Sequence, residues 1–542
     1  MRNVPLDSPD IDEKSVTAWE RHIGKRVSDP PMLRSQLAGG TLPGAIFDSA
    51  RRHSRLPALT ISGRTVSHGE VDDGAGRAAA HLASLGVTRG ERVMLLAAVG
   101  IDEIFAYLGA MRLGATIVLV NPTLTASEMA ELASVSEPGV LVGRGAPLEV
   151  ASRMEARGIR EIIGLRHEDR GESTTPVMQL AEGSWPVQPL DPKSVAILAF
   201  TSGTTGQSKP TPLTHSALIA SIRGAMMAWR WTPEDHLVHS LPISHQHGLS
   251  GVHATLLAGS KATLLGHLDA EALLNTVSKD EATIHFGVAG IHQRLLDRLG
   301  GRASGLSRLR LAVSGSGPLP VGLYRRYESV TGHALLERYG TTESGLNVSN
   351  PYRGPRLAGH VGLPLPGVEM ALLSDDGRMT DRKGEVLLRG PQVFGGYLGV
   401  PASDQPFFGD WFRTGDIGTL HEKTGFLRIV GRSKEVIISG GMNVYPREVE
   451  DAILAFPDVT DVAVSSVASK SWGEEVIAVV SPSSLDTSEL REFLRTRLAG
   501  YKRPKRILTA EAIPRNHVGK VVHSDLVKMF LSDDSAVPPD GI

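Results

Sequence analysis

A loop rich in glycine and hydroxyl side chains carries the strongest local signal for chemistry in this sequence. It reads Phe200-Thr-Ser-Gly-Thr-Thr-Gly-Gln-Ser-Lys209 and follows the apolar run from Val195 to Phe200, which predicts a strand leading into the loop. Backbone N–H groups, hydroxyl donors and a mobile positive charge are what a polyphosphate needs. The spacing differs from that of the Walker loop, because the lysine comes three residues after Gly206. Taken alone, the segment also fits an ordinary surface turn.

Four further motifs follow this loop in order along the chain. They are Glu337-Arg-Tyr-Gly-Thr-Thr-Glu343, Arg413-Thr-Gly-Asp416, Gly431-Arg-Ser-Lys434 with Ser439-Gly-Gly-Met-Asn443, and Pro514-Arg-Asn-His-Val-Gly-Lys520. Together the five motifs resemble the adenylate-forming superfamily, which includes acyl-CoA synthetases, luciferases and the adenylation domains of peptide synthetases. The resemblance covers the chain from about residue 40 to residue 530.

The resemblance implies a site for ATP and magnesium. In this family the loop from Thr201 to Lys209 closes over the β- and γ-phosphates, Tyr339 would stack on the adenine, and Asp416 would accept hydrogen bonds from the ribose. Thr201 and Glu343 would hold Mg²⁺, which prefers oxygen ligands. The full set assigned to the nucleotide is Thr201, Ser202, Gly203, Thr204, Thr205, Gly206, Lys209, Gly315, Ser316, Gly317, Glu337, Arg338, Tyr339, Gly340, Thr341, Thr342, Asp416, Arg432 and Lys520.

The reaction that the resemblance implies has two halves. A substrate carboxylate attacks the α-phosphorus of ATP, and the acyl-adenylate then passes its acyl group to a thiol, normally that of coenzyme A. Because the first half brings two anions together, we expect charge neutralisation and positioning rather than a protein nucleophile. The implied catalytic residues are Lys520, Lys209, His245, Thr342 and Glu343. For the second half, the family rotates its C-terminal domain about a hinge that corresponds to Lys434, and this rotation brings Gly440 and Gly441 beside the pantetheine channel.

Other segments bear on the identity of the acid. The segment His239-Ser-Leu-Pro-Ile-Ser-His-Gln-His-Gly-Leu249, together with Ser314-Gly-Ser-Gly-Pro-Leu-Pro320, looks most like malonyl-CoA synthetases, and His245 matches the histidine that lines the carboxylate entry. Arg294 falls where malonate-activating enzymes carry an arginine for the distal carboxylate, which a guanidinium can hold bidentately. The alternative is that Arg294 lies on the polar side of a helix ending at Gly300 and is merely solvated.

Two departures from the family pattern affect this site. Pro210 replaces the usual glycine after the loop lysine, which removes an N–H and fixes φ. The acyl-pocket strand reads Phe286-Gly-Val-Ala-Gly290, where the family usually has Phe-Gly-Val-Pro-Thr. The segments Pro212-Leu-Thr-His215 and Ile291-His-Gln293 also resemble oxalyl-CoA synthetases, which keeps a shorter diacid open.

More than one function fits these motifs. The leading one is an ATP- and Mg²⁺-dependent acid:CoA ligase that acts on a small dicarboxylic acid such as malonate. The alternatives are a fatty or aryl acid:CoA ligase, and an acyl-AMP ligase that loads a carrier protein supplied by a partner. A nucleotide-binding protein without turnover is disfavoured because Lys209, Glu343, Asp416 and Lys520 are retained. A serine hydrolase is disfavoured because the G-x-S-x-G elbow is missing.

Histidines cluster in one part of the sequence, at positions 236, 239, 245, 247 and 253. Such a cluster can indicate a metal site. No carboxylate stands at a recognisable ligand spacing from them, so we do not expect a metal site there.

The elements that must position these residues alternate along the first part of the chain. A helix ending near Leu85 precedes a strand at Val93 to Ala97, a helix at Ile101 to Leu113 and a strand at Thr116 to Val120. The next helix opens at Thr125-Ala-Ser-Glu128, which has the spacing of a capping box. This alternation predicts an α/β fold with parallel strand pairing.

The pattern changes twice toward the C-terminus. Short β-like runs separated by Gly and Pro from about residue 360 to residue 432 predict a small β-rich subdomain. After that, a helix from Pro446, strands near 459–467 and 474–480, and a helix at 488–498 predict a separate α+β domain. The predicted division is a loosely ordered segment at 1–40, a large multi-layer α/β adenylation domain at 41–431, a small mobile C-terminal α+β domain at 432–530, and a tail at 531–542.

Composition excludes several classes of protein. Lys plus Arg is 57 and Asp plus Glu is 59, and the formal net charge of −2 excludes binding to nucleic acid or membranes through bulk charge. The absence of cysteine excludes disulfides, Cys-ligated zinc, iron–sulfur clusters and a thiol nucleophile. Because we find neither a secretory signal nor an apolar run of about 18 residues, we expect a cytoplasmic protein without a transmembrane segment, whose partners are a small carboxylic acid and coenzyme A.

Overall fold

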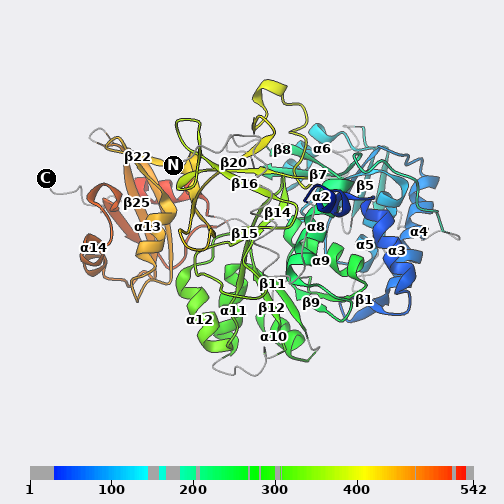
Figure 1. Ribbon diagram of the computed structural model, residues 1–542, viewed down its shortest axis with the longest axis horizontal. Helices are drawn as coiled ribbons and strands as arrows, with labels where there is room; N and C mark the ends of the chain where they lie inside the picture. Colours follow the sequence, from blue (N-terminus) through cyan, green and yellow to red (C-terminus); the bar gives the residue numbers. More distant parts are fainter. Residues whose placement is uncertain are drawn as a thin grey trace.

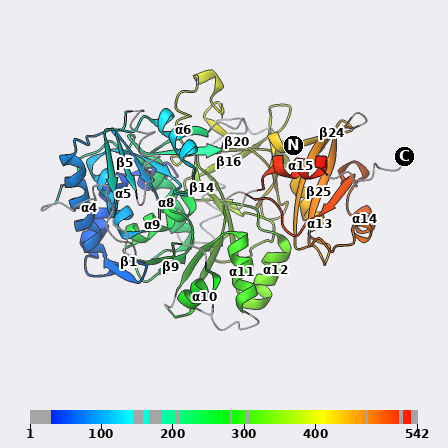
Figure 2. The ribbon, with the colours of Figure 1, turned by 180° about the vertical axis from the view of Figure 1, so that it is seen from behind.

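A large α/β part and a smaller C-terminal unit lie along the longest axis of the molecule. The structure is a computed structural model that describes residues 30–143, 158–165, 184–202, 208–266, 269–279, 282–299, 306, 308–469, 472–515 and 521–532. Helices α3 (Leu42–Arg52) and α4 (His68–Ser84) lie at one end of the molecule, and α13 (Pro446–Ile453) and α14 (Thr487–Arg495) lie toward the other end (Figure 1). Figure 2 shows α4 and α14 at the same two ends from behind. This arrangement is the α/β fold with a small C-terminal domain that the sequence predicted.

A six-stranded sheet belongs to the first part of the chain. Its order is β6-β5-β3-β4-β7-β8, in which β7 and β8 are antiparallel and the other neighbours are parallel. The strands are β3 (Arg92–Leu96), β4 (Thr116–Val120), β5 (Val140–Gly143), β6 (Glu161–Gly164), β7 (Val195–Ser202) and β8 (Ser208–Thr214). The predicted strands at 93–97 and 116–120 are confirmed as β3 and β4.

A nine-stranded sheet is the second sheet of this large part. Its order is β15-β14-β13-β12-β11-β9-β10-β1-β2, with parallel pairing from β13 to β1 and antiparallel pairing at both edges. The strands are β1 (Pro57–Ile61), β2 (Arg64–Ser67), β9 (His236–His239), β10 (Lys261–Leu264), β11 (Ile284–Gly287), β12 (Leu311–Ser314), β13 (Leu336–Thr341), β14 (Gly345–Ser349) and β15 (Leu363–Pro364).

Buried helices fill the core of this large part. Helix α5 (Ile101–Leu113) has the predicted bounds and is buried along almost its whole length. It packs so closely against α4 that a Cβ at Gly109 would come within 2.8 Å of the Ala79 backbone nitrogen, so glycine is needed there. Helices α8 (His215–Trp229) and α9 (Gln246–Ala258) are largely buried as well. The predicted capping box is confirmed at α6 (Ala126–Ser136).

Four helices lie further out. They are α2 (Pro30–Ala38), α10 (Ala270–Lys279), α11 (Ala289–Leu299) and α12 (Val321–Thr331). In Figure 1, α10, α11 and α12 lie beside β11 and β12. Helix α11 buries Ile291, Leu295 and Leu299 on one side, which is the spacing of an amphipathic helix.

An antiparallel sheet forms the predicted β-rich subdomain. Its order is β17-β16-β18-β20-β19, and β21 pairs with β20. The elements are β16 (Glu369–Leu373), β17 (Met379–Thr380), β18 (Lys383–Arg389), the 3-10 turn η2 (Ala402–Asp404), β19 (Phe407–Phe408), β20 (Trp411–Leu420) and β21 (Leu427–Arg432).

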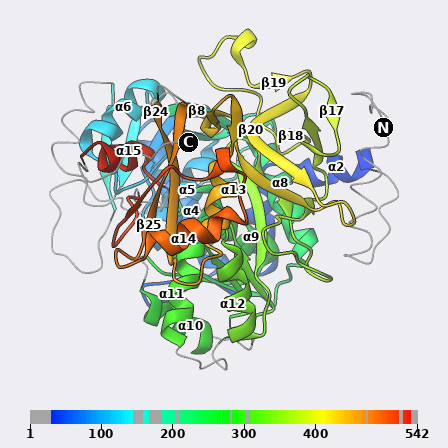
Figure 3. The ribbon, with the colours of Figure 1, turned by 90° about the vertical axis from the view of Figure 1, so that its left-hand side faces the viewer.

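The C-terminal unit has apolar clusters of its own, which lie on the two sides of strands β24 and β25. Its elements besides α13 and α14 are η3 (Ser433–Glu435), β22 (Ile437–Ser439), β23 (Met442–Val444), β24 (Asp461–Ser469), β25 (Gly473–Ser481), η4 (Gly500–Lys502), β26 (Arg506–Thr509) and α15 (His523–Ser532). Seen along the long axis, α13, α14 and β25 lie in front of the large part (Figure 3). The predicted domain boundary at 432 coincides with the end of β21.

Two polar contacts join the C-terminal unit to the β-rich sheet. Arg428 on β21 forms an ion pair with Asp451 on α13, with Nη2 2.8 Å from Oδ2. The Lys383 ammonium lies 3.6 Å from the centre of the Tyr445 ring. Contacts of this kind at a domain surface are weak enough to be exchanged when domains move. In the described part of the chain, no helix has the length and apolar character that a membrane span requires.

Candidate active site

The predicted motifs meet where neighbouring parallel strands end. Gly315 to Gly317 follow β12, and the turn from Thr342 to Ser344 follows β13. Residue 245, which caps α9, lies a few residues beyond the end of β9. Because ligands of open α/β sheets bind at the carboxyl ends of the strands, this edge is the candidate active site.

The predicted phosphate loop connects the two strands of a hairpin. Thr201 on β7 lies opposite Lys209 on β8, and Phe200 lies opposite Pro210. Residues 203–207, which include Gly203, Thr204, Thr205 and Gly206, lie outside the described residues, as does the side chain of Ser202. Pro210 does not interrupt the pairing, because β8 is the edge strand of its sheet and the Pro210 carbonyl accepts a hydrogen bond from Leu398 (3.0 Å).

Glu343, Thr201 and Lys209 are gathered around one tyrosine. The Tyr397 hydroxyl donates to Glu343 Oε1 at 2.7 Å, and Lys209 Nζ lies 5.1 Å from the centre of the Tyr397 ring. Burial and the nearby Glu343 charge raise the pKa of Tyr397, and a hydrogen bond with Thr201 opposes this. A carboxylate and a hydroxyl are donors that fit a hard cation, with Lys209 beside them for phosphate oxygens. Sequence reasoning missed Tyr397, whose only signal was the turn-like Phe394-Gly-Gly-Tyr397.

A second group, centred on Asp416, lies between β13 and the β-rich sheet. The Tyr339 hydroxyl donates to Asp416 Oδ2 at 2.6 Å, and Arg432 Nε donates to Oδ1 at 2.9 Å. Burial raises the pKa of Asp416, although the Arg432 charge opposes the shift. A carboxylate has about four acceptor positions, so two stay available for ribose hydroxyls. The predicted residues Tyr339, Asp416 and Arg432 therefore lie together.

Two glycines of the predicted site cannot carry a side chain. A Cβ at Gly340 would collide with the Gly345 carbonyl oxygen, and a Cβ at Gly315 would collide with the guanidinium of Arg338. A Cβ at Gly317 would meet no atom within 4 Å. The backbones of β13 and β14 therefore approach each other closely at Gly340, and the Arg338 side chain packs against Gly315.

Glu337 and Thr341 form hydrogen bonds with other groups of the protein. Glu337 Oε1 accepts the Leu319 N–H at 3.3 Å, and Thr341 Oγ1 lies 2.8 Å from Ser344 Oγ. Burial raises the pKa of Glu337 to about 7, although the Arg447 charge opposes the shift. Thr342 is only partly buried in the turn beside Glu343. The hydrogen bond from Leu319 to Glu337 therefore helps to keep the loop after Gly317 in place.

His245 and Arg294 are both exposed. His245 is the N-cap residue of α9, and Arg294 lies on the outer side of α11, beside exposed Asp297 and Arg298. The exposure of Arg294 agrees with the solvated alternative from the sequence, and its predicted contact with a carboxylate stays a prediction. The buried histidines nearby are dispersed: His236 Nε2 lies 2.8 Å from Thr263 Oγ1, and His253 Nε2 lies 2.8 Å from the Tyr107 hydroxyl.

Among the described residues, no group of three or more His, Cys, Asp or Glu side chains is arranged to hold a metal ion. That finding does not bear on the smaller Thr201 and Glu343 donor set, which would share a cation with nucleotide phosphates.

The predicted hinge and coenzyme A segment lie in the C-terminal unit. Lys434 is exposed in η3, directly after β21. Gly440 and Gly441 form the two-residue turn between β22 and β23, with φ of 59° and 76°, which favour glycine. The Gly440 N–H donates to the Trp472 carbonyl at 2.8 Å. Lys520, the predicted catalytic lysine, lies outside the described residues.

Comparisons with known proteins identify the family. The profile of the AMP-binding enzyme family matches residues 46–398, and that of the AMP-binding enzyme C-terminal domain matches residues 448–520. The chain therefore belongs to the AMP-binding enzyme family, and the resemblance read from its motifs is confirmed.

The relatives include acid–CoA ligases. The mitochondrial malonate–CoA ligase ACSF3 of Bos taurus is 36% identical over 64% of this chain and 66% of its own length, and an oxalate–CoA ligase of Arabidopsis thaliana is 32% identical over 91% of this chain and 99% of its own. The crystal structure of ATP-bound MatB from Rhodopseudomonas palustris matches with a TM-score of 0.83 and 32% identity, covering 91% of this chain and 99% of MatB. The match thus spans just under two thirds of ACSF3 but almost all of the other two.

Proposed function

We propose that this member of the AMP-binding enzyme family is an AMP-forming acid–CoA ligase that acts on a small dicarboxylic acid of malonate or oxalate size. Relatives named malonate–CoA ligase and oxalate–CoA ligase support the activity and the size of the acid. The observation that carries the proposal is the meeting of Thr201, Lys209 and Glu343 at one edge of the fold that matches ATP-bound MatB.

In the first half-reaction, a carboxylate oxygen of the acid attacks the α-phosphorus of ATP and pyrophosphate leaves. The attacking group and the triphosphate are both negative, so the barrier depends on positive charge and fixed donors. Lys209 would bind phosphate oxygens, and Tyr339, Asp416 and Arg432 would bind the nucleoside. Glu343 and Thr201 would hold Mg²⁺, which supplies charge neutralisation between the phosphates. Lys520 would bridge the carboxylate and the α-phosphate.

In the second half-reaction, the coenzyme A thiolate attacks the acyl carbon and AMP leaves with the bonding electron pair. The C-terminal unit would rotate about Lys434 and bring the turn at Gly440 and Gly441 to the thiol. Support comes from the two exchangeable contacts, Arg428 with Asp451 and Lys383 with Tyr445, which join this unit to the β-rich sheet. A carrier protein as acceptor is the alternative, and the names of the relatives favour coenzyme A.

Arg294 is one candidate for the second carboxylate of the diacid. Its support is its place in the sequence, on the helix that follows β11. In that role, Arg294→Ala should weaken the use of a dicarboxylic acid far more than that of a monocarboxylic acid, and equal losses for both would contradict the role. The protein is expected in the cytoplasm, although the ACSF3 relatives are named mitochondrial.

The test is pyrophosphate release from ATP over a panel of acids, each with and without coenzyme A. The panel contains oxalate, malonate, methylmalonate, acetate, and medium-chain and aryl acids. We expect strong turnover with malonate or oxalate when coenzyme A is present. Turnover with a fatty or aryl acid alone would contradict the diacid, and an adenylate that accumulates despite coenzyme A would indicate a carrier protein as acceptor.

A further inference from the structure

The hydroxyl of Tyr397 lies between the two residues that the sequence assigns to magnesium. It donates to Glu343 Oε1 at 2.7 Å, and the Thr201 hydroxyl forms a hydrogen bond with the same phenol. Thr201 lies on β7 of the six-stranded sheet, whereas Glu343 lies in the turn between β13 and β14 of the nine-stranded sheet. Tyr397 itself lies between β18 and η2 of the β-rich subdomain. One side chain therefore connects three parts of the fold at the candidate active site.

The phenol proton fixes the direction of these two hydrogen bonds. A tyrosine hydroxyl has one proton to donate, and Tyr397 donates it to Glu343. The Thr201 hydroxyl is therefore the donor in its bond to Tyr397. With its proton directed toward the phenol, Thr201 Oγ1 can offer a lone pair to a cation. Glu343 can do the same, because a carboxylate has about four acceptor positions and Tyr397 takes one of them.

Lys209 belongs to the same group of side chains. Its Nζ lies 5.1 Å from the centre of the Tyr397 ring, within the range of a cation–π contact. Lys209 also lies opposite Thr201 in the β7–β8 hairpin. The Leu398 N–H donates to the Pro210 carbonyl at 3.0 Å, which joins the segment carrying Tyr397 to the residue directly after Lys209. Tyr397 thus contacts the phosphate-binding lysine as well as the two metal donors.

The backbone of Tyr397 is held on both sides. Gln405 Oε1 accepts the Tyr397 N–H at 2.7 Å, and Gln405 Nε2 donates to the Tyr397 carbonyl at 2.9 Å. The Phe394 N–H donates to the Glu343 carbonyl at 2.8 Å, and the Phe394 ring meets the Tyr397 ring edge to face, with centroids 5.0 Å apart. Gly396 has a φ of 120°, and a Cβ there would come within 2.7 Å of Gln405 Oε1. These contacts fix where the hydroxyl points.

A fixed hydroxyl in this place prepares the metal donors before the nucleotide binds. A free carboxylate and a free threonine hydroxyl would lose rotational freedom on binding a cation, whereas donors that are already held lose less. Groups that orient the ligands of a metal in this way contribute to its affinity without touching it. The phenol is also neutral, so it orients Glu343 without cancelling the negative charge that attracts the cation.

We propose that Tyr397 is a positioning residue that holds Glu343 and Thr201 in the arrangement that binds Mg²⁺ together with the phosphates of ATP, with Lys209 kept beside them. The inference rests on the proposed function and deepens it, because it concerns the nucleotide site of the first half-reaction. Tyr397 acts through the two donors and not through the acid or coenzyme A. Its removal should therefore weaken the effect of Mg²⁺ on ATP binding and leave the acid site intact.

The test measures how strongly Mg²⁺ increases the affinity for ATP. Calorimetric titration of the full-length protein with ATP, in EDTA and in excess Mg²⁺, gives the ratio of the two dissociation constants without turnover. Tyr397→Phe removes only the hydroxyl and should reduce this ratio by about tenfold or more, while the affinity in EDTA stays within about threefold. In assays of pyrophosphate release, the Mg²⁺ concentration at half-maximal rate should rise by a similar factor, and the KM for the acid should stay near that of wild type.

The matched control is Tyr324→Phe. Tyr324 lies on α12 and donates its hydroxyl to the Arg356 carbonyl at 3.2 Å, so this variant also loses one hydroxyl and one hydrogen bond. It should leave the effect of Mg²⁺ on ATP affinity unchanged.

A double-mutant cycle tests whether Tyr397 acts through Glu343. Glu343→Gln keeps the shape of the side chain and removes its charge. Adding Tyr397→Phe to that variant should reduce the effect of Mg²⁺ on ATP affinity by less than about threefold more, since the group that Tyr397 orients is already lost.

Several outcomes would overturn the inference. Equal losses of ATP affinity in EDTA and in Mg²⁺ would mean that Tyr397 contacts the nucleotide itself. A lowered thermal midpoint of Tyr397→Phe with an unchanged effect of Mg²⁺ would make Tyr397 structural, and full additivity with Glu343→Gln would show that it does not act through that carboxylate. A wild-type protein whose affinity for ATP does not respond to Mg²⁺ would overturn the inference whichever acid it activates. If Mg²⁺ strengthens ATP binding but no acid releases pyrophosphate, the proposed function is wrong, and the titrations still decide the role of Tyr397.

Discussion

Three arginines, of which Arg338 is buried and Arg310 and Arg356 are partly buried, differ in their partners. Arg310 holds Asp235 and Arg356 holds backbone carbonyls, whereas Arg338 Nε and Nη2 have no hydrogen-bond partner among the described residues. The sequence does not distinguish the three, since Asp235 stands 75 residues from Arg310. Burial alone therefore identifies no functional arginine, because the partners of the guanidinium decide what it does.

Glu337 carries a pH dependence that follows from burial. Burial raises its folded-state pKa to about 7, from an ordinary value of 4.5. Between these two values the folded state binds a proton that the unfolded state lacks, so stability falls as pH rises through this window. The free energy of unfolding of Glu337→Gln, measured relative to that of wild type, should therefore be about 2 to 3 kcal/mol higher at pH 8 than at pH 5. Urea denaturation at both pH values measures this difference.

The matched control for that experiment is Glu422→Gln. Glu422 is exposed in the turn between β20 and β21, so its carboxylate is solvated in both the folded and the unfolded state. Its variant should differ from wild type by a small, constant amount at both pH values. If the difference in free energy of unfolding between Glu337→Gln and wild type is also the same at both pH values, the claim that Glu337 is protonated in the folded state is wrong.

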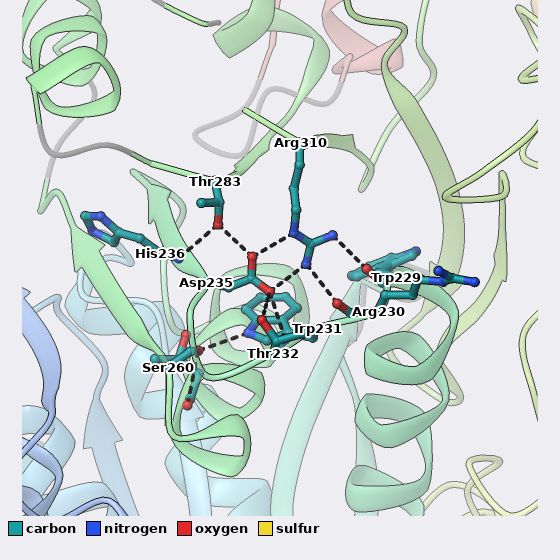
Figure 4. A network of polar contacts seen from close by, with 10 residues as sticks. Trp229, Arg230, Trp231, Thr232, Asp235, His236, Ser260, Thr283 and Arg310 are labelled. Carbon is teal, nitrogen blue, oxygen red and sulfur yellow. Dashed lines mark hydrogen bonds and ion pairs between the residues drawn. The ribbon is translucent and has the colours of Figure 1, made fainter. Parts of the chain in front are cut away.

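At the scale of elements, one polar network fastens the strands that carry the site. Asp235, Thr283 and Arg310 are the residues immediately before β9, β11 and β12, and Thr283 Oγ1 and Arg310 both donate to Asp235 (Figure 4). Arg310 Nη1 also donates to the Trp229 carbonyl at the end of α8 (2.9 Å). The network fixes the amino ends of three neighbouring parallel strands, whose carboxyl ends carry the loops of the candidate active site.

Removing the charge of Asp235 should loosen these strands. Burial opposes its ionisation, but hydrogen bonds from Arg310, the Thr232 N–H and Thr283 hold the pKa of Asp235 below its usual value. Asp235→Asn leaves Arg310 partly buried and unpaired, so it should lower the free energy of unfolding at pH 7 by about 3 kcal/mol. The loss should shrink at acidic pH, because wild-type Asp235 is then protonated as well.

The control is an exposed pair of similar geometry. Asp525 Oδ1 lies 2.8 Å from Lys528 Nζ, and both side chains are largely in water. Asp525→Asn should change the free energy of unfolding by less than about 0.5 kcal/mol. Equal losses for the two variants in urea denaturation would show that the network does not hold the strands.

The ends of helices that are set by local sequence signals were predicted to within a few residues. Gly100 and Gly114 bracket α5, and Thr125 with Glu128 opens α6, so both helices have the predicted starts. Helix α14 ends at Arg495 instead of Leu498. Leu498 continues the apolar spacing because it still packs in the C-terminal core after the backbone has left the helix. The spacing of apolar residues in the sequence reflects which side chains are buried, and burial can continue after the helix has ended.

At the scale of the whole molecule, the sequence predicted the family and named candidate site residues, but it did not predict the contacts between them. Motifs such as Glu337 to Glu343 are contiguous, so one chain suffices to recognise them. The link from Tyr397 to Glu343, and the closeness of Arg338 to His247, depend on side chains from separate elements that only the folded sheet brings together. No local pattern marks such contacts, because tertiary packing decides them.

The arrangement of the two parts of the molecule leads to a last prediction, at Lys434. This residue lies in η3, between Arg432, which is held by Asp416, and the first strand of the C-terminal unit. A hinge absorbs large dihedral changes at a few positions, and proline fixes φ and restricts the residue before it. Lys434→Pro should therefore slow thioester formation from a preformed acyl-adenylate by about tenfold or more while pyrophosphate release in the first half-reaction changes little.

Lys434→Ala keeps the backbone free and should preserve both half-reactions, which separates the effect of the backbone from that of the side chain. Single-turnover measurements of each half-reaction decide the matter: similar losses in both for the proline variant would place the hinge elsewhere in the chain.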